Sequence, residues 1–186
     1  MLLPIIGTAI RLIWIVVEYP YLRRYRIKQA QNWDRHSAIL WDFANLVEPV
    51  GMALGLAGIG RMQFKPYVFA SLGLVFLVAG IVIRWTAVYT LGKYFTGTVV
   101  IKSDHQLIRK GLYKHLRHPA YSGTLLAHLG LGLCFSNWFS LILSSVPYFL
   151  VAWYRIRVEE QALACTFGPD YATYCKTTKR LIPLLY

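Results

Sequence analysis

The stretch that decides the fold is YVFASLGLVFLVAGIVIRWTAVYTL, residues 67–91, in which Arg84 is the one charged residue. A helix needs about 20 predominantly apolar residues to cross the hydrocarbon core of a bilayer, so this stretch predicts a membrane span. Two earlier runs, roughly 2–22 and 38–60, meet the same requirement. The sequence therefore predicts at least three transmembrane helices before residue 92.

Two shorter apolar runs follow, Ala120 to Phe135 and Trp138 to Tyr154. They meet at Ser136-Asn137, which predicts a tight helical hairpin, with a re-entrant pair as the alternative. We therefore expect an all-α, polytopic membrane helix bundle of about five transmembrane helices. Residues 1–91 would hold the first three helices, and residues 92–186 would hold the catalytic region.

The composition supports a membrane protein and argues against other classes. Of the 186 residues, 56% are hydrophobic and 15% are charged, whereas charged residues make up nearer a quarter of a soluble domain. The net charge of +12 does not favour a nucleic-acid partner, because the cations stand between apolar runs. Three cysteines without a CxxC pair predict neither a disulfide framework nor a closed zinc site. The first run lacks a basic start and a small-residue cleavage site, so we expect an uncleaved anchor.

The distribution of lysine and arginine predicts the orientation. Segments 23–35 and 92–118 and the tail after Tyr154 hold 16 of the 20 cations, whereas the loop between the second and third spans holds Arg61 and Lys65. Lysine and arginine in short loops resist translocation. We therefore expect an outside N-terminus and a cytoplasmic C-terminus, with the active site on the cytoplasmic side.

Charged residues fall inside the predicted spans, among them Arg11, Asp42, Glu48 and Arg84, and each needs a partner or water. Counted from the cytoplasmic ends of their spans, Glu48 and Arg84 differ in depth by roughly 5 Å. This depth predicts an interhelical ion pair between them, with a substrate or proton path as the alternative.

Polar and aromatic residues gather between the third and fourth spans, from Gly111 to Gly123. Pro119 suits the first turn of the fourth helix, whose free amides would face the cytoplasm and could seat a carboxylate. An ordinary interfacial anchor cluster is the alternative interpretation. His115 and His118 are three residues apart, but no further ligand stands at a familiar spacing, so we expect no metal site. His105 alone would be interpreted as a surface histidine.

A charged stretch follows the last span. Arg155 and Glu159 share one helical face, and Arg157 and Glu160 share another. These could be two solvated ion pairs of little energetic weight. However, they are the only adjacent acids in the chain, and they stand where a membrane helix is expected to emerge beside the Arg-His-Pro loop.

Taken in order, these residues resemble the isoprenylcysteine carboxyl methyltransferases, integral membrane enzymes that use S-adenosylmethionine. The matching positions are His105-Gln-Leu-Ile108, Gly111-x-Tyr113, Arg117-His-Pro-x-Tyr121, the Arg155 to Glu160 stretch, Phe167-Gly168 with Tyr171 and Tyr174, and Arg180-x-Ile-Pro183. The ordered set covers about the last 85 residues and is specific, whereas Arg-His-Pro alone would be weak. The chain departs from eukaryotic members in having fewer spans before this region.

The resemblance implies a cofactor pocket and a catalytic residue. Arg155 would face the substrate, and the cofactor would be held by His105, Gln106, Leu107, Ile108, Tyr113, His118, Pro119, Ala120, Tyr121 and Glu159. The expected activity is that of a protein-S-isoprenylcysteine O-methyltransferase-like enzyme, which methylates the carboxylate of a lipophilic acceptor that enters from the bilayer. Phospholipid N-methyltransferases and membrane reductases that use NADPH share parts of this pattern and are the alternatives. The sequence contains no GxGxxG loop, and this absence counts against a reductase. The polar residues cluster at one face, whereas those of a channel would line several spans.

Overall fold

The computed structural model describes residues 2–24, 31–32, 37–101 and 104–182, and within them the chain is almost entirely helical. The helices are α1 (Leu2–Arg24), α2 (Ser37–Leu56), α3 (Pro66–Leu91), α4 (Pro119–Cys134), α5 (Trp138–Phe167) and α6 (Pro169–Thr177). Two short strands, β1 (Gln31–Asn32) and β2 (Val100–Ile101), pair antiparallel. The predicted all-α class is confirmed.

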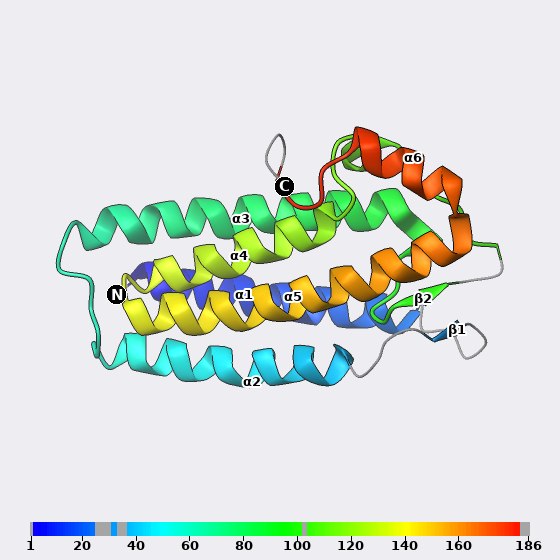
Figure 1. Cartoon of the computed structure of the whole chain (residues 1–186). Coiled ribbons are helices and arrows are strands. Elements are labelled where there is room, and N and C mark those ends of the chain that lie inside the picture. The colour runs from blue at the N-terminus through cyan, green and yellow to red at the C-terminus, as the bar shows by residue number, and fades with distance from the viewer. Residues whose placement is uncertain (1, 25–30, 33–36, 102–103, 183–186) are drawn as a thin grey trace.

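The five longer helices lie side by side as a bundle (Figure 1). α2 packs on α5, and α4 packs on both α3 and α5. Within the described residues, α1, α2, α3 and α5 are long and apolar enough to cross a membrane. Their outward side chains are apolar, such as Val16, Leu46 and Val75, which are 61–73% exposed. The protein is therefore an integral membrane protein.

α4 differs from the crossing that the sequence predicts at 120–135. Its 16 residues span about 24 Å, less than the roughly 30 Å of a bilayer core. Most of its residues are buried among the longer helices. The expected five segments are therefore four long helices and one short inner helix.

The α4–α5 hairpin closes at the same end of the bundle as the α2–α3 loop. Met62 donates its backbone N–H to the Ser136 carbonyl at 2.8 Å, and Trp138 donates to the Gly60 carbonyl at 3.0 Å. α6, β1, β2 and the loops before α4 gather at the opposite end (Figure 1). The described parts of all three cation-rich segments lie there. Of the predicted cytoplasmic cations, Arg26, Lys28, Arg35 and Lys102 lie outside the described residues.

The predicted Glu48–Arg84 pair is wrong. Arg11 donates to Glu48 at 3.1 Å, and Arg84 pairs with Glu18 and donates to Thr124 at 2.7 Å. Both new partners come from α1, on which they stand seven residues apart and therefore on one face. Glu48 and Arg84 do not pair, although they lie at a similar depth, because their helices have different neighbours. α3 packs mainly on α4, whereas α2 packs mainly on α5.

Candidate active site

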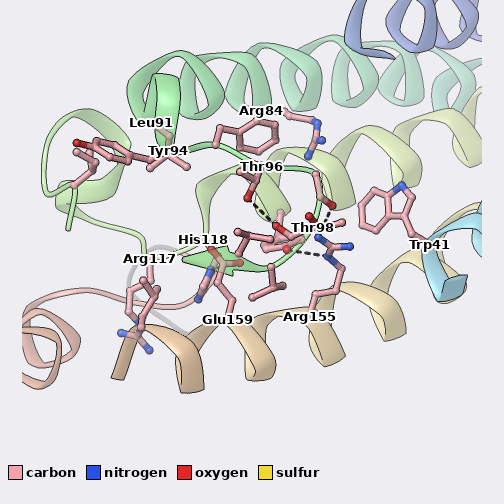
Figure 2. Close-up of a pocket in the computed structure, with 18 of the residues that line it drawn as sticks. Trp41, Arg84, Leu91, Tyr94, Thr96, Thr98, Arg117, His118, Arg155 and Glu159 are labelled. Carbon is pink, nitrogen blue, oxygen red and sulfur yellow. Dashed lines mark hydrogen bonds and ion pairs between the residues drawn. The ribbon is translucent and has the colours of Figure 1, made fainter. Parts of the chain in front are cut away.

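One large cavity opens where the loops meet the end of the bundle. It has a volume of about 550 Å³, and its wall is built from α1, α2, α3, α4, α5, α6 and the residues between α3 and α4. Arg155 and Glu159 project from α5 toward the loop that carries Thr96 and Thr98, and Trp41 approaches from α2 (Figure 2). Both halves of the chain thus contribute to one cavity.

The cavity brings together almost all of the residues that the resemblance singled out. Those on its wall are Arg155, His105, Gln106, Leu107, Ile108, Tyr113, His118, Ala120, Tyr121 and Glu159. Pro119 is not on the wall; it is buried and starts α4 directly after His118. His105 is half-buried, with its ring 5.1 Å from Tyr94 and 6.0 Å from Phe167. It is therefore not the isolated surface histidine that its position alone suggests.

The closing segment of the chain holds the Arg-His-Pro loop in place. Arg117 donates its backbone N–H to the Lys179 carbonyl at 2.7 Å, and His118 donates to the Arg180 carbonyl at 3.1 Å. Lys179 in turn donates to the His115 carbonyl at 3.0 Å. These bonds make a short parallel ladder that fixes the backbone entering α4. Pro183, the last residue of the matching motif, lies outside the described residues.

Glu160 is held by cations from two other segments. Arg117 Nε lies 3.0 Å from one carboxylate oxygen, and Arg180 Nη2 lies 2.7 Å from the other. His118 Nε2 lies 3.4 Å from Glu160 Oε1. The Arg157–Glu160 pair that helical spacing suggested is wrong, because the Arg157 guanidinium lies over the Trp153 ring, 3.6 Å from its centroid. Glu160 therefore ties α5 to the Arg-His-Pro loop and to the closing segment.

Glu159 has different surroundings, although it is the next residue. Its side chain is 33% exposed and lies on the cavity wall, and one of its oxygens is 3.8 Å from His118 Nδ1. In Figure 2 the His118 and Glu159 side chains lie next to each other, whereas Arg117 points away from them. His118 thus stands between a carboxylate inside the cavity and a carboxylate outside it.

Arg155 is buried, with 5% of its surface exposed. Its guanidinium donates to the Tyr121 hydroxyl at 3.1 Å and to the Gly97 carbonyl at 2.7 Å, and it lies 5.7 Å from the centre of the Trp41 ring. Arg155 is therefore not part of a solvated ion pair on the outside of the helix. Its N–H groups lie inside the cavity, where they can bind oxygen atoms.

Two tyrosines on the cavity wall stay neutral at physiological pH. Burial, followed by the negative charge of Glu159, raises the pKa of Tyr113 well above its usual value. Burial also raises the pKa of Tyr174 to about 12, and its hydroxyl donates to the Tyr113 carbonyl at 2.7 Å. Both side chains therefore give the cavity uncharged aromatic walls.

The structure adds residues that sequence reasoning missed. Trp14 and Glu18 of α1, Leu91 at the end of α3 and Tyr94 in the 3-10 turn that follows it also line the cavity. The sequence contains a weak indication that Glu18 is functional, because it is the first acidic residue in the chain and follows the apolar run 2–17. Among the residues that the structure describes, no three potential metal ligands come together.

Comparison with known proteins decides the family. The sequence model of the isoprenylcysteine carboxyl methyltransferase (ICMT) family matches residues 72–165, which is half of the chain and includes α4 and most of the cavity-lining part of α5. The chain belongs to this family. The match starts inside α3 and ends near the C-terminal end of α5, so it holds Arg155, Glu159 and the Arg-His-Pro loop.

Individual relatives agree with this family. A probable protein-S-isoprenylcysteine O-methyltransferase from Oryza sativa subsp. indica is 37% identical over 130 residues, which cover 66% of each chain. The protein-S-isoprenylcysteine O-methyltransferase of Schizosaccharomyces pombe is 34% identical over 124 residues, covering 66% of this chain and 52% of the relative. The chain thus matches about half to two thirds of the length of these relatives.

The fold also matches a solved family structure. The eukaryotic intramembrane Ras methyltransferase ICMT superposes with a TM-score of 0.66 at 25% sequence identity, over 78% of this chain and 52% of that chain. The membrane helical architecture of this ICMT family member is therefore shown by sequence and by structure.

Proposed function

We propose that this ICMT family member is a membrane methyltransferase that moves a methyl group from S-adenosylmethionine to the carboxylate of a lipid-like acid. The acceptor would be of the isoprenylcysteine type, as the names of the relatives suggest. The observation that carries the proposal is that one cavity holds a buried arginine, Arg155, and a carboxylate, Glu159, on successive turns of α5. These two groups suit an anionic acceptor and a cationic cofactor respectively.

The cavity residues fit S-adenosylmethionine. The Glu159 carboxylate is on the wall and can accept hydrogen bonds from an ammonium or ribose group. Tyr94, Ile108 and Tyr113 offer apolar and aromatic surface for a purine ring. When bound, the cofactor supplies an electrophilic methyl group. We assign cofactor binding to the wall residues from His105 to Glu159 named above, with Pro119 shaping the start of α4.

Arg155 would hold the acceptor. A guanidinium can bind a carboxylate at two points and fix its orientation. Arg155 Nη2 already donates to the Gly97 carbonyl oxygen at 2.7 Å, so its N–H groups are oriented to bind oxygen atoms in the cavity. A carboxylic acid with a pKa of about 3.5 is ionised at neutral pH, so the reaction needs no general base. Alignment and exclusion of water by the loop residues 94–101 would then supply the catalysis.

The lipid-like part of the acceptor would enter from the bilayer. Ile15 and Tyr19 of α1 and Asp42 of α2 line the cavity and are also exposed on the outside of the bundle. A path between α1 and α2 would therefore connect lipid with Arg155. The cofactor would enter from water at the loop end, which the cation distribution assigns to the cytoplasm. Residues 92–186 would form the catalytic region, with residues 1–91 completing the acceptor side.

Calorimetry on the detergent-purified protein tests this assignment. We expect S-adenosylhomocysteine to bind and NADPH not to bind. Binding of NADPH alone would favour a membrane reductase, and binding of neither would favour a non-catalytic membrane protein. The acid and amine acceptors are distinguished by the methyl-transfer assay described at the end of the Discussion.

A further inference from the structure

Trp41 lies between the proposed acceptor-binding arginine and a buried ion pair of the bundle. It stands in the second turn of α2, in the part of the chain that precedes the family match. Its ring lines the cavity, 5.7 Å from the Arg155 guanidinium carbon, and its centre is 5.6 Å from that of the Tyr148 ring. Figure 2 shows it approaching Arg155 from α2. Tyr148 and Arg155 are seven residues apart, about 10 Å along α5, so the Trp41 ring occupies the space between them.

The Tyr148 end of this space borders a buried carboxylate. The Tyr148 hydroxyl donates to Glu48 at 2.6 Å, and Arg11 Nε donates to the same carboxylate at 3.1 Å. Glu48 is only 3% exposed, and it lies two turns after Trp41 on the same face of α2. Opposite charges attract strongly where water is scarce. Without a barrier, this carboxylate would compete with the carboxylate of an acceptor for the Arg155 guanidinium.

Two hydrogen bonds direct the Arg155 guanidinium away from Glu48. Nε donates to the Tyr121 hydroxyl at 3.1 Å, and Nη2 donates to the Gly97 carbonyl at 2.7 Å, and both oxygen atoms belong to residues that line the cavity. The Trp41 indole supports this direction, because its bulk occupies the space through which the guanidinium would turn toward Glu48. A cation over an aromatic ring is also attracted to the ring. Segments from α2, α4 and the loop before β2 thus fix one arginine.

From this placement we infer that Trp41 is a positioning residue for methyl transfer, which holds the Arg155 guanidinium toward the acceptor carboxylate and away from Glu48. The inference rests on the proposed function and gives a role in it to a residue outside the family match. A displacement of about 1 Å between reacting groups can cost on the order of a hundredfold in rate. Loss of the indole should therefore reduce both the rate of transfer and the preference of the site for a carboxylate.

The test uses the full-length protein in lipid nanodiscs, with an S-prenylated N-acetylcysteine as the acceptor acid and its primary amide as a neutral analogue of equal size. Trp41→Leu should lower kcat for transfer from labelled S-adenosylmethionine at least about tenfold. With S-adenosylhomocysteine bound, calorimetry should show that the preference for the acid over the amide falls about fivefold. The affinity for S-adenosylhomocysteine itself should stay unchanged. Trp41→Phe, which keeps an aromatic ring, should recover most of the rate and of the preference.

The matched control is Trp153→Leu on α5. The Trp153 indole also lies under an arginine, 3.6 Å from the Arg157 guanidinium carbon, but this pair is outside the cavity. Trp153→Leu should therefore retain kcat and the preference for the acid.

An unchanged kcat and an unchanged preference in Trp41→Leu would overturn the inference alone. Equal weakening of acid and amide binding would also overturn it, because that is the result of a purely structural role or of a contact with the tail. A loss in Trp153→Leu as large as that in Trp41→Leu would contradict it as well. If thermal unfolding shows that Trp41→Leu does not fold, Trp41→Met is measured in its place. Absence of transfer to the acid by the unmodified protein would overturn the proposed function and the inference with it.

Discussion

The two adjacent acids of α5 face different surroundings. Glu159 lies on the cavity wall beside His118, whereas Glu160 lies outside the cavity between Arg117 and Arg180. Neighbouring helical residues point about 100° apart, so one helix can place one acid inside a site and the next in its supporting structure. Glu159 is therefore a binding residue in our account, and Glu160 is a positioning residue that acts through His118 and the closing segment.

Replacing each acid by its amide separates these roles. Glu159→Gln should weaken S-adenosylhomocysteine binding on the order of tenfold, because an amide accepts weaker hydrogen bonds from a cationic ligand. Its thermal unfolding should change little. Glu160→Gln should instead lower the free energy of unfolding by about 1 kcal/mol, because it leaves the partly buried Arg117 and the more exposed Arg180 without their anion. Calorimetry and thermal unfolding of the same preparations measure both quantities.

Equal effects of the two variants on affinity and on unfolding would contradict this division. Glu160→Asp serves as the control, since it keeps the charge. It should recover most of the stability lost in Glu160→Gln.

In our proposal, Arg155 binds the carboxylate of the acceptor. Arg155→Lys should lose most methyl transfer, on the order of a hundredfold, because a lysine offers a point charge where the guanidinium fixes a carboxylate at two points. Binding of S-adenosylhomocysteine should be retained, since Glu159 and the loop residues are unchanged. Single-turnover transfer and calorimetry check the two parts of this prediction.

The control for Arg155→Lys is Arg157→Lys on the same helix. Arg157 is exposed and lies over Trp153. A loss of transfer in Arg157→Lys as large as that in Arg155→Lys would mean that the effect is one of general charge rather than of carboxylate orientation.

At the scale of single residues, the motif resemblance selected residues that the fold brings to one cavity, but it did not predict their partners. His105, Tyr113, His118 and Glu159 all line the cavity, and their binding of the cofactor stays a prediction. The partners of Glu160 could not be predicted, because Arg117 and Arg180 are 43 and 20 residues away in sequence, and helical spacing offered the nearer Arg157 instead. Local periodicity describes one helix and carries no information on which segment packs against it.

Among the helices, α3 and α4 form the closest contact in the bundle. A Cβ atom added at Gly80 would lie 2.4 Å from the Ala127 backbone nitrogen, and one added at Gly130 would lie 2.3 Å from that of Leu77. Small residues at such positions let two membrane helices pack backbone to backbone. This contact sets the position of α4 and hence of Tyr121 near its start.

Gly80→Ala should therefore destabilise the protein, by about 1–3 kcal/mol, because the neighbouring backbone cannot move aside as a flexible side chain would. The control is Val82→Leu, which adds volume at an exposed position two residues further along α3. Thermal unfolding in detergent compares them. An unfolding temperature that falls as much in Val82→Leu as in Gly80→Ala would contradict the close α3–α4 contact.

The helices themselves could be predicted from apolar runs, but their pairings could not. The apolar run 67–91 matches α3 (Pro66–Leu91) almost residue for residue. The run 38–60 ends as a helix at Leu56, since Gly58 and Gly60 adopt positive φ angles of 75° and 81°. The ion pairs of Arg11 and Glu18 escaped prediction because the depth of a residue along its span does not define which way its helix faces.

For the whole molecule, the loops at one end of the bundle hold several of the proposed cofactor-binding residues and most of the cations. The described parts of these loops gather with α6 at the end opposite the α2–α3 loop (Figure 1). We propose that the cation-rich end faces the cytoplasm. The cofactor would then reach the cavity from the water of the cytoplasm, and the acceptor would reach the same cavity from the bilayer.

Thiol labelling tests this orientation. Cys165 is exposed near the end of α5, so an impermeant thiol reagent should label it in sealed inverted vesicles and not in right-side-out vesicles. Cys134 is fully buried and reports neither side. The control is Gln63→Cys in the exposed α2–α3 loop, placed in a Cys165→Ser and Cys175→Ser background, which should show the opposite pattern. Labelling of Cys165 in right-side-out vesicles would reverse the proposed orientation.

The central claim is methylation of a carboxylate, and the chemical stability of the product tests it most directly. Labelled methyl is transferred from S-adenosylmethionine to an S-prenylated cysteine analogue, and the isolated product is treated with alkali. A methyl ester releases volatile labelled methanol under alkali, whereas a methylated amine retains its label. We predict release of the label, with loss of transfer in Arg155→Lys. Retention of the label in the product would contradict the account and favour N-methylation of an amine.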